Sequence, residues 1–188
     1  MGNFTFSKTE IDGVYMIMPK VHRDQRGYFM ETYNQTDFEK AGLFYTFVQD
    51  NQSSSRRGVL RGLHFQKTFP QAKLVRVVSG EVFDVAVDLR KDSPSYGRWI
   101  GVFLSDKNQK QLLIPRGFAH GFMVISEYAE FTYKCDEFYH PEDEGGLPYC
   151  DPTIGIKWPE VGEVIVNEKD KHYPTLKASG IVFGGNKP

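Results

Sequence analysis

The sequence predicts an all-β fold of the sandwich, jelly-roll or barrel class, and three observations support this prediction. The 188 residues include 15 Phe and 10 Tyr, side chains that favour strands. Apolar and polar residues alternate with a period of two, most clearly from Glu81 to Leu89, where a strand with one apolar face is predicted. Short runs of this kind recur at close spacing with turn residues between them. A chain of this length is near the usual size of one domain, so we expect a single domain over residues 1–188.

The predicted strands follow one another along the whole chain. Their ranges are 27–33, 44–48, 59–65, 74–78, 81–89, 99–104, 111–114, 121–124 and 130–135, and turns are predicted at 24–27, 79–80, 92–94, 105–108 and 115–117. One short helix is predicted over 36–41, with Asn34 or Thr36 as its N-cap and Gly42 as its left-handed stop. Residues 141–159 are rich in Pro, Gly and Asp, and we expect them to form a long structured loop over the barrel.

Composition excludes several classes of function. A formal net charge of -1 gives no general attraction for nucleic acid or acidic membranes. The chain contains no apolar run that approaches the roughly 20 residues of a membrane span, and its N-terminus lacks a signal-peptide pattern. The two cysteines, Cys135 and Cys150, are read as free thiols in a reducing compartment. Neither a P-loop nor a GxGxxG fingerprint is present, which disfavours a mononucleotide fold or a nicotinamide enzyme. We therefore expect a cytoplasmic protein.

Two histidine motifs have the spacing of the cupin form of the jelly roll. The motifs are Gly58-x5-His64 and Pro115-x-Gly117-x2-His120. In a metal cupin the first motif would continue as His-x-His and add a carboxylate, because a divalent ion needs three or four N and O ligands. Here Gln66 stands in place of the second His, and no Asp or Glu occurs over 67–80. We therefore expect no metal and no other cofactor, which leaves both imidazoles for acid and base work.

Polar side chains interrupt the predicted strands around these motifs. They are Arg61, His64, Gln66, Lys73, Arg76 and Asp84. Buried charges persist only when they are paired or used, so these residues either line an interior site or cover a solvated outer face of a sheet. A further cluster, Arg56, Arg57 and Arg61, suits a diphosphate or is simply solvated. With an unperturbed pKa of about 6.5, the imidazoles of His64 and His120 suit proton abstraction near neutral pH. We interpret His22, His140 and His172 as structural.

Motifs spread in one order from about Gly13 to Asp170 resemble the dTDP-4-dehydrorhamnose 3,5-epimerase family. They are RGYFME (26–31), FVQDN (47–51), VLRGLHFQ (59–66), KLVR (73–76), GEVFDV (80–85), IPRGFAHGF (114–122), YKC (133–135) and GIKWP (155–159). The resemblance implies a cupin-type double-stranded β-helix (jelly roll) with short peripheral helices, a homodimer and catalysis without a cofactor. It also implies the third step of dTDP-L-rhamnose synthesis, in which C3 and C5 of dTDP-4-dehydro-6-deoxy-D-glucose are inverted to give dTDP-4-dehydro-L-rhamnose.

The same resemblance implies a role for individual residues. His64 corresponds to the base, Asp170 to the carboxylate that orients it, Tyr133 to the proton donor on the opposite sugar face, and Lys73 to the stabiliser of the enolate. The substrate contacts it implies are Arg26, Glu31, Gln49, Asp50, Asn51, Arg61, Lys73, His120, Glu144 and Lys169, with Tyr139 as the ring that stacks on thymine. The chain departs from the family pattern at Gln52, where members often have His, and at Ala72, where Gly usually precedes the lysine.

These residue types suit proton transfer beside a ketone. The C–H bond there is acidic only because the charge left behind spreads onto oxygen, so a base is needed at carbon and a cation at oxygen. Inversion then needs a proton from the other face, which a neutral phenol can donate. Three alternatives remain open. The protein could be an epimerase that inverts one carbon of a related nucleotide keto sugar, a catalytically silent cupin that only binds a nucleotide sugar or a partner, or a metal-dependent cupin oxygenase or isomerase.

Overall fold

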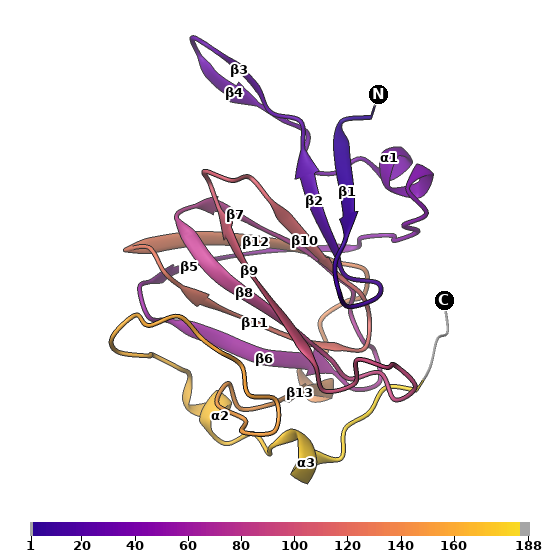
Figure 1. The fold of residues 1–188 in the computed structure, drawn as a ribbon, viewed down its shortest axis with the longest axis vertical. Helices are drawn as coiled ribbons and strands as arrows, with labels where there is room; N and C mark the ends of the chain where they lie inside the picture. The colour runs from indigo at the N-terminus through magenta and orange to yellow at the C-terminus, as the bar shows by residue number, and fades with distance from the viewer. Residues whose placement is uncertain (1, 185–188) are drawn as a thin grey trace.

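Two antiparallel β-sheets that face each other form the body of the molecule (Figure 1). The structure, a computed structural model, describes residues 2–184. The six-stranded sheet has the order β1-β2-β10-β7-β12-β5, and the five-stranded sheet has the order β13-β6-β11-β8-β9. From β5 to β12 most consecutive strands alternate between the two sheets, which is the winding of a jelly roll. The predicted all-β jelly roll is confirmed.

The strands agree with the sequence prediction best in the middle of the chain, from residue 59 to residue 135. The elements are β1 (Phe4–Lys8), β2 (Tyr15–Pro19), β3 (His22–Asp24), β4 (Gly27–Phe29), α1 (Gln35–Lys40), β5 (Gln49–Arg56), β6 (Leu60–Gln66), β7 (Lys73–Ser79), β8 (Glu81–Asp88), β9 (Trp99–Ser105), β10 (Gln111–Ile114), β11 (Phe118–Val124), β12 (Tyr128–Cys135), η1 (Pro141–Asp143), β13 (Glu144–Gly146), α2 (Glu168–Lys171) and α3 (Leu176–Ser179). The seven predicted strands from 59 to 135 correspond to β6 through β12. The predicted helix is α1, where the Asn34 side chain accepts from the backbone N–H of Asp37 and Gly42 follows with φ +80°.

Both faces of β8 are buried, which changes the meaning of the alternation in this strand. Phe83, Val85 and Val87 lie on its outer side and pack against apolar side chains of the C-terminal segment. Its inner side carries Val82 and Ala86, which join the core between the sheets. The prediction of a single apolar face for this strand is therefore wrong. Asp84, the polar residue between Val82 and Ala86, lies inside the barrel.

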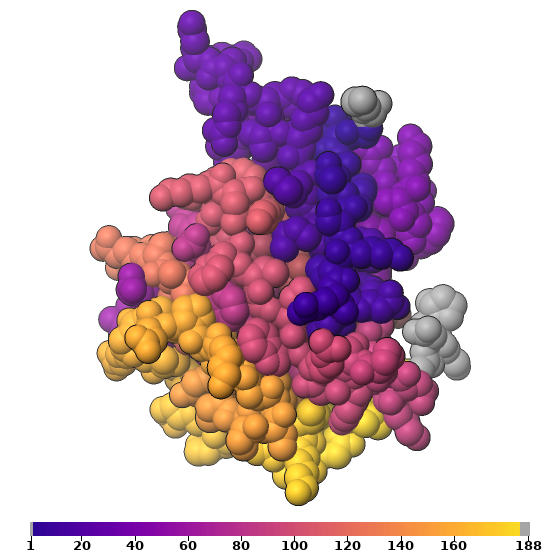
Figure 2. All heavy atoms as spheres, in the orientation of Figure 1, coloured from indigo at the N-terminus to yellow at the C-terminus, as the bar shows by residue number. Residues whose placement is uncertain are grey.

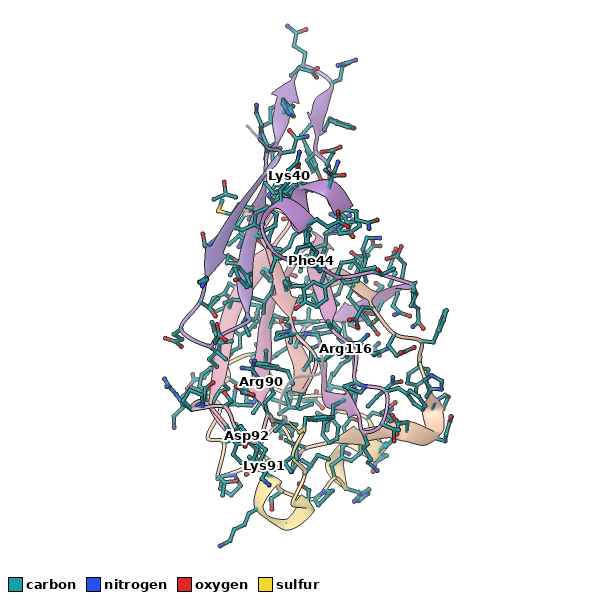
Figure 3. The ribbon with its side chains drawn as sticks, turned by 90° about the vertical axis from the view of Figure 1, so that its right-hand side faces the viewer. Lys40, Phe44, Arg90, Lys91, Asp92 and Arg116 are labelled. Atoms are coloured by element: carbon teal, nitrogen blue, oxygen red, sulfur yellow. The ribbon has the colours of Figure 1, made fainter. Side chains whose placement is uncertain are left out.

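The predicted strand over 44–48 is wrong, and the strand that follows it was not predicted. Tyr45 and Phe47 pack in an apolar cluster under α1, while Phe44, labelled in Figure 3, is 78% exposed. Alternation here reflects packing against a helix rather than strand pairing. The ladder with β12 begins at Gln49 and continues through β5, whose sequence QDNQSSSR is polar throughout. Polar residues on the inner face of β5 line a cavity, so this strand lacks the apolar pattern that would reveal it.

Two further predictions need correction at the ends of the molecule. Only Gly27–Phe29 of the strand predicted over 27–33 is extended, and it pairs with β3 in a hairpin that projects beyond both sheets (Figures 1 and 2). Within the expected loop 141–159, β13 pairs with β6 and adds an edge strand. Its sequence EGG has weak strand propensity, so pairing with β6 rather than propensity determines its conformation. Among residues 2–184, no helix is long and apolar enough to cross a membrane.

Candidate active site

A cavity of about 510 Å³ lies between the two sheets. Arg61, His64 and His120 line it from the five-stranded sheet, Asn51, Lys73 and Tyr133 line it from the six-stranded sheet, and Asp170 of α2 also faces it. A second cavity of about 280 Å³ shares Asn51, His64, Lys73 and Tyr133 with the first and adds Gln49, Tyr139 and Glu144. The two cavities therefore form one site, which brings together all four predicted catalytic residues and most of the predicted substrate contacts.

His64 is held by a buried carboxylate. Its Nε2 lies 2.8 Å from Oδ1 of Asp170, a residue that is 2% exposed. The other oxygen, Oδ2, accepts from the backbone N–H of Gly62 at 3.4 Å. Because a carboxylate only accepts, Nε2 carries the hydrogen and Nδ1 is left as the basic nitrogen. Asp170 would also stabilise the imidazolium that forms when Nδ1 takes up a proton.

Tyr133 faces His64 from the opposite sheet. It projects from β12 into the cavity that His64 enters from β6. Burial is the main cause that raises the pKa of the Tyr133 phenol to about 12. The phenol is therefore protonated at neutral pH and has a proton to donate. His64 and Tyr133 thus line the same cavity from the two different sheets.

Lys73 supplies a cation beside Tyr133, from the neighbouring strand β7 of the same sheet. Its Nζ lies 5.7 Å from the centre of the Tyr133 ring, within the range of a cation–π contact. Burial lowers the pKa of this amine, and the nearby acidic groups Cys135, Asp84 and Glu144 act in the opposite direction. The side chain lines both cavities, so its ammonium can approach an oxygen of a bound ligand.

Glu144 organises the end of the site formed by β13. Its carboxylate pairs with Lys169 Nζ at 2.5 Å and accepts from the hydroxyls of Tyr139 at 2.5 Å and Tyr173 at 2.9 Å. Burial raises the pKa of Glu144, but these hydrogen bonds and the proximity of His64 outweigh it and lower the pKa to about 2. Glu144 is thus ionised and neutralised by its partners throughout the physiological range.

Tyr173 is a site residue that the sequence analysis missed. Its ring meets the His64 ring edge-on with centroids 6.1 Å apart, and it fills the space over Gly146, where a Cβ would come within 2.3 Å of the ring. Tyr173 therefore buttresses both His64 and Glu144. It follows α2 in a tail without strand or helix periodicity, so only its position three residues after Asp170 could have suggested a role.

Three predicted substrate contacts lie away from this cavity in the same chain. Arg26 is on the projecting β3–β4 hairpin, 90% exposed, and pairs with Asp24. The carboxylate of Glu31, just beyond that hairpin, accepts from the Asn3 side chain. Asp50 points to the outer face of the six-stranded sheet, where its carboxylate pairs with Lys134 at 2.9 Å. Of the arginine cluster, Arg61 lines the cavity and donates to Ser55, whereas Arg56 and Arg57 are exposed.

The residue that replaces the second metal-binding His has a structural role. The Gln66 side chain donates to the carbonyls of Phe69 and Phe138 and accepts from the backbone N–H of His140, so it fastens two loops together. His64 and His120 each direct Nε2 to a carboxylate of their own. Residues 2–184 contain no group of three or more His, Cys, Asp or Glu side chains arranged to hold a metal ion.

From this donor set we expect activity to survive treatment with a strong chelator. Two imidazoles that are already hydrogen-bonded to carboxylates are a poor set of ligands for a divalent ion. The measurement is the initial rate before and after dialysis against EDTA, with metal analysis of the same sample. Activity that is lost to EDTA and restored by a divalent ion would contradict the expectation.

The sequence matches one family model over almost its whole length. The model describes dTDP-4-dehydrorhamnose 3,5-epimerase and matches residues 8–178, a range that includes His64, Tyr133 and Asp170. The chain belongs to the dTDP-4-dehydrorhamnose 3,5-epimerase family. The predicted family is confirmed, and so is the predicted class of enzyme, a carbohydrate epimerase.

Individual members of the family resemble this epimerase closely. The dTDP-4-dehydrorhamnose 3,5-epimerase of Methanothermobacter thermautotrophicus is 54% identical over 183 residues, which are 96% of this chain and 99% of the relative. The crystal structure of dTDP-6-deoxy-D-glucose-3,5-epimerase from Legionella pneumophila in complex with dTDP-4-keto-L-rhamnose has a TM-score of 0.92 and 46% identity, over 95% of this chain and 97% of that one. ChmJ, a 3'-monoepimerase from Streptomyces bikiniensis, has a TM-score of 0.86 and 32% identity, over 92% and 88% of the two chains.

Substitution of Tyr139 tests the stacking contact with thymine that the family resemblance implies for this residue. The ring is 48% exposed, and stacking on a nucleotide base is worth about 1–3 kcal/mol. This contact is equally present before and during the reaction, so Tyr139→Ala should raise KM about 10-fold or more and change kcat little. Tyr139→Phe is the matched control, because it keeps the ring and loses only the hydrogen bond to Glu144. A fall in kcat with unchanged KM in Tyr139→Ala would contradict the assignment.

Proposed function

We propose that this epimerase inverts C3 and C5 of dTDP-4-dehydro-6-deoxy-D-glucose and releases dTDP-4-dehydro-L-rhamnose, as part of dTDP-L-rhamnose synthesis. The observation that carries the proposal is that His64 and Tyr133 line one cavity from opposite sheets, with Lys73 beside Tyr133 in the same cavity. The Legionella relative binds dTDP-4-keto-L-rhamnose, which supports the same type of ligand here. The single domain and the cytoplasmic location expected from the sequence stay predictions.

The proposed mechanism uses each of these groups once per carbon. Nδ1 of His64 removes the proton beside the C4 ketone, and Asp170 stabilises the imidazolium through Nε2. The electron pair moves to the carbonyl oxygen, and the ammonium of Lys73 stabilises the enolate that forms. Tyr133 then donates its phenolic proton to the opposite face of the same carbon, and the carbonyl forms again as the enolate electron pair returns to that carbon. Before the next inversion His64 releases its proton to solvent, and solvent restores the proton to the phenolate of Tyr133. Repetition at the second carbon completes the double inversion.

The product of the purified chain tests this proposal. We expect dTDP-4-dehydro-6-deoxy-D-glucose to be converted to an isomer whose configuration, determined after reduction of the ketone, is inverted at both C3 and C5. Recovery of unchanged sugar would overturn the proposal. ChmJ supports a second candidate, since a 3'-monoepimerase has the same fold. An isomer inverted at C3 or C5 alone would support that candidate.

We propose further that the chain is a homodimer in which each projecting hairpin reaches the cavity of the other subunit. An exposed two-stranded arm with Tyr28 50% and Phe29 69% exposed supports such a role, because apolar side chains of this size favour burial. Such a dimer would let Arg26 contact the substrate bound in the partner's cavity, although it lies away from the cavity of its own chain. Light scattering at micromolar concentration should give twice the 21.6 kDa of the chain. A monomer would contradict it.

Mixed subunits test the shared site more sharply. Arg26→Ala and His64→Ala should each be impaired alone. When the two variants are unfolded together and refolded, each heterodimer should contain one cavity with both residues intact, so that activity returns to about one quarter of that of the wild type. If the mixture is no more active than its components, each hairpin does not act on the partner's cavity.

A further inference from the structure

A second histidine–carboxylate pair lies inside the barrel. Asp84 of β8 is 0% exposed, and its Oδ2 lies 2.9 Å from Nε2 of His120 on β11. His120 and His64 are direct neighbours, because they are Cα partners on the paired strands β11 and β6. The two imidazoles thus stand next to each other on one wall of the cavity, and each has its own buried carboxylate. The mechanism described above uses only one of these pairs.

Packing alone gives no reason for a carboxylate at position 84. On the same side of β8 its neighbours are Val82 and Ala86, both in the apolar core. The second oxygen, Oδ1, is buried and has no hydrogen-bond partner among residues 2–184. A buried charge with an unsatisfied oxygen is destabilising, and an apolar side chain of similar size would be favoured if stability alone mattered. Asp84 is therefore better explained by an interaction within the cavity.

The cation that such an oxygen would serve is Lys73, which lines the cavity together with His120, the hydrogen-bond partner of Asp84. The titratable groups around Lys73 come from five strands: Tyr133 and Cys135 on β12, Asp84 behind His120 on β8, Glu144 on β13, His64 on β6 and His120 on β11. Burial is the main cause that raises the pKa of the Cys135 thiol to about 11, so it carries no charge at neutral pH. Glu144 is already paired with Lys169 and accepts from two tyrosines. Asp84 is left as the carboxylate with a free oxygen.

We propose that Asp84 is a positioning residue of the epimerase site, which acts through two neighbours. Its Oδ2 fixes His120 with the hydrogen on Nε2, and its negative charge keeps Lys73 in the ammonium form. The benefit to the reaction rests on the proposed function, because the ammonium is needed where the enolate oxygen becomes negative. The protonation states themselves do not depend on that function and can be measured on the enzyme alone.

The test combines kinetics with NMR on Asp84→Asn, an almost isosteric change that removes the charge. We expect kcat to fall about 10-fold to 100-fold, as for other partners that orient a functional imidazole, with a smaller change in KM. The ε-carbon signal of ¹³C-labelled Lys73, assigned with Lys73→Arg, should titrate about one pH unit or more lower than in the wild type. Asp92→Asn is the matched control, because Asp92, labelled in Figure 3, is exposed between β8 and β9 and lines neither of the two cavities. It should leave both readouts unchanged.

Two results would overturn the proposal. One is an unchanged titration of Lys73 in folded Asp84→Asn, whatever happens to the rate, because a structural defect would lower the rate without moving the titration. The other comes from the wild type and needs no folded variant: ¹⁵N signals of His120 must report a hydrogen on Nε2, and a tautomer with the hydrogen on Nδ1 alone would contradict the role of Oδ2. If the wild type fails to turn over the sugar although the Lys73 titration and the His120 tautomer are as expected, the proposed function is wrong. The inferred charges of Asp84 and Lys73 are then still supported.

Discussion

Replacement of His64 by Ala is expected to abolish both the formation of product and the exchange of substrate hydrogens with deuterated solvent. His64 is the group whose Nδ1 is free to take a proton, since Nε2 is engaged by the buried Asp170. Without this base no enolate forms, and neither inversion nor exchange can begin. The loss of a positioned general base costs about 10²-fold to 10⁴-fold. Both rates, followed by NMR in deuterated water, should fall by at least this factor.

His172→Ala is the matched control for this substitution. His172 lies at the end of α2, close in sequence to Asp170, but its side chain is 78% exposed. We expect wild-type rates from it. If His64→Ala retained exchange while it lost inversion, another group would form the enolate and His64 would act only in the return of the proton. That result would contradict its assignment as the base.

Replacement of Tyr133 by Phe is expected to separate exchange from inversion. The variant keeps the ring beneath Lys73 and removes only the hydroxyl, whose pKa of about 12 keeps it protonated at neutral pH. His64 can still form the enolate and return a solvent-derived proton to the face it came from. The inverted product should therefore fall about 10²-fold to 10⁴-fold, while uptake of deuterium falls much less. Both quantities are read from the same NMR time course.

Equal loss of exchange and inversion in Tyr133→Phe would contradict the division of labour. Tyr133 would then be needed to form the enolate, and two separate proton carriers could not be assigned. Thermal unfolding of the variant provides the control for folding, because the hydroxyl lies in a cavity and its removal should change stability little. The two substitutions together distinguish a base and an acid on opposite faces from a single group that serves both faces.

Periodicity predicted the strands whose apolar faces are continuous and failed where the cavity begins. Strands β6 through β12 were predicted because their packing residues alternate or run together. β5 was missed because the residues on its inner face, such as Asn51, line the cavity and are polar. In β8 the alternation was recognised, but its orientation could not be derived, since the C-terminal segment covers the outer face and makes it as apolar as a core. A local pattern of apolar and polar residues does not show that a strand lines a cavity, and it does not show that a segment distant in sequence packs on the outer face of a strand.

The resemblance to the family identified residues around the cavity that periodicity could not. It brought together His64 and Tyr133, which meet because the two sheets face each other, and Asp170, which reaches His64 from α2. It did not reveal Tyr173, whose contacts with His64 and Glu144 depend on the path of an irregular tail. The resemblance also implied a substrate contact for Arg26, but it did not reveal that this residue lies on an exposed hairpin away from the cavity of its own chain.

The most direct test of the account is NMR of dTDP-4-dehydro-6-deoxy-D-glucose turned over by the wild-type enzyme in deuterated water. If His64 and Tyr133 exchange protons at both carbons beside the ketone, deuterium must enter at C3 and at C5, and the configuration at both must be inverted. Because both carbons flank the same carbonyl, the ammonium of Lys73 can stabilise either enolate. Deuterium at only one of the two carbons would contradict the double epimerisation and favour the single-carbon reaction. The absence of deuterium from both would contradict proton transfer by this site altogether.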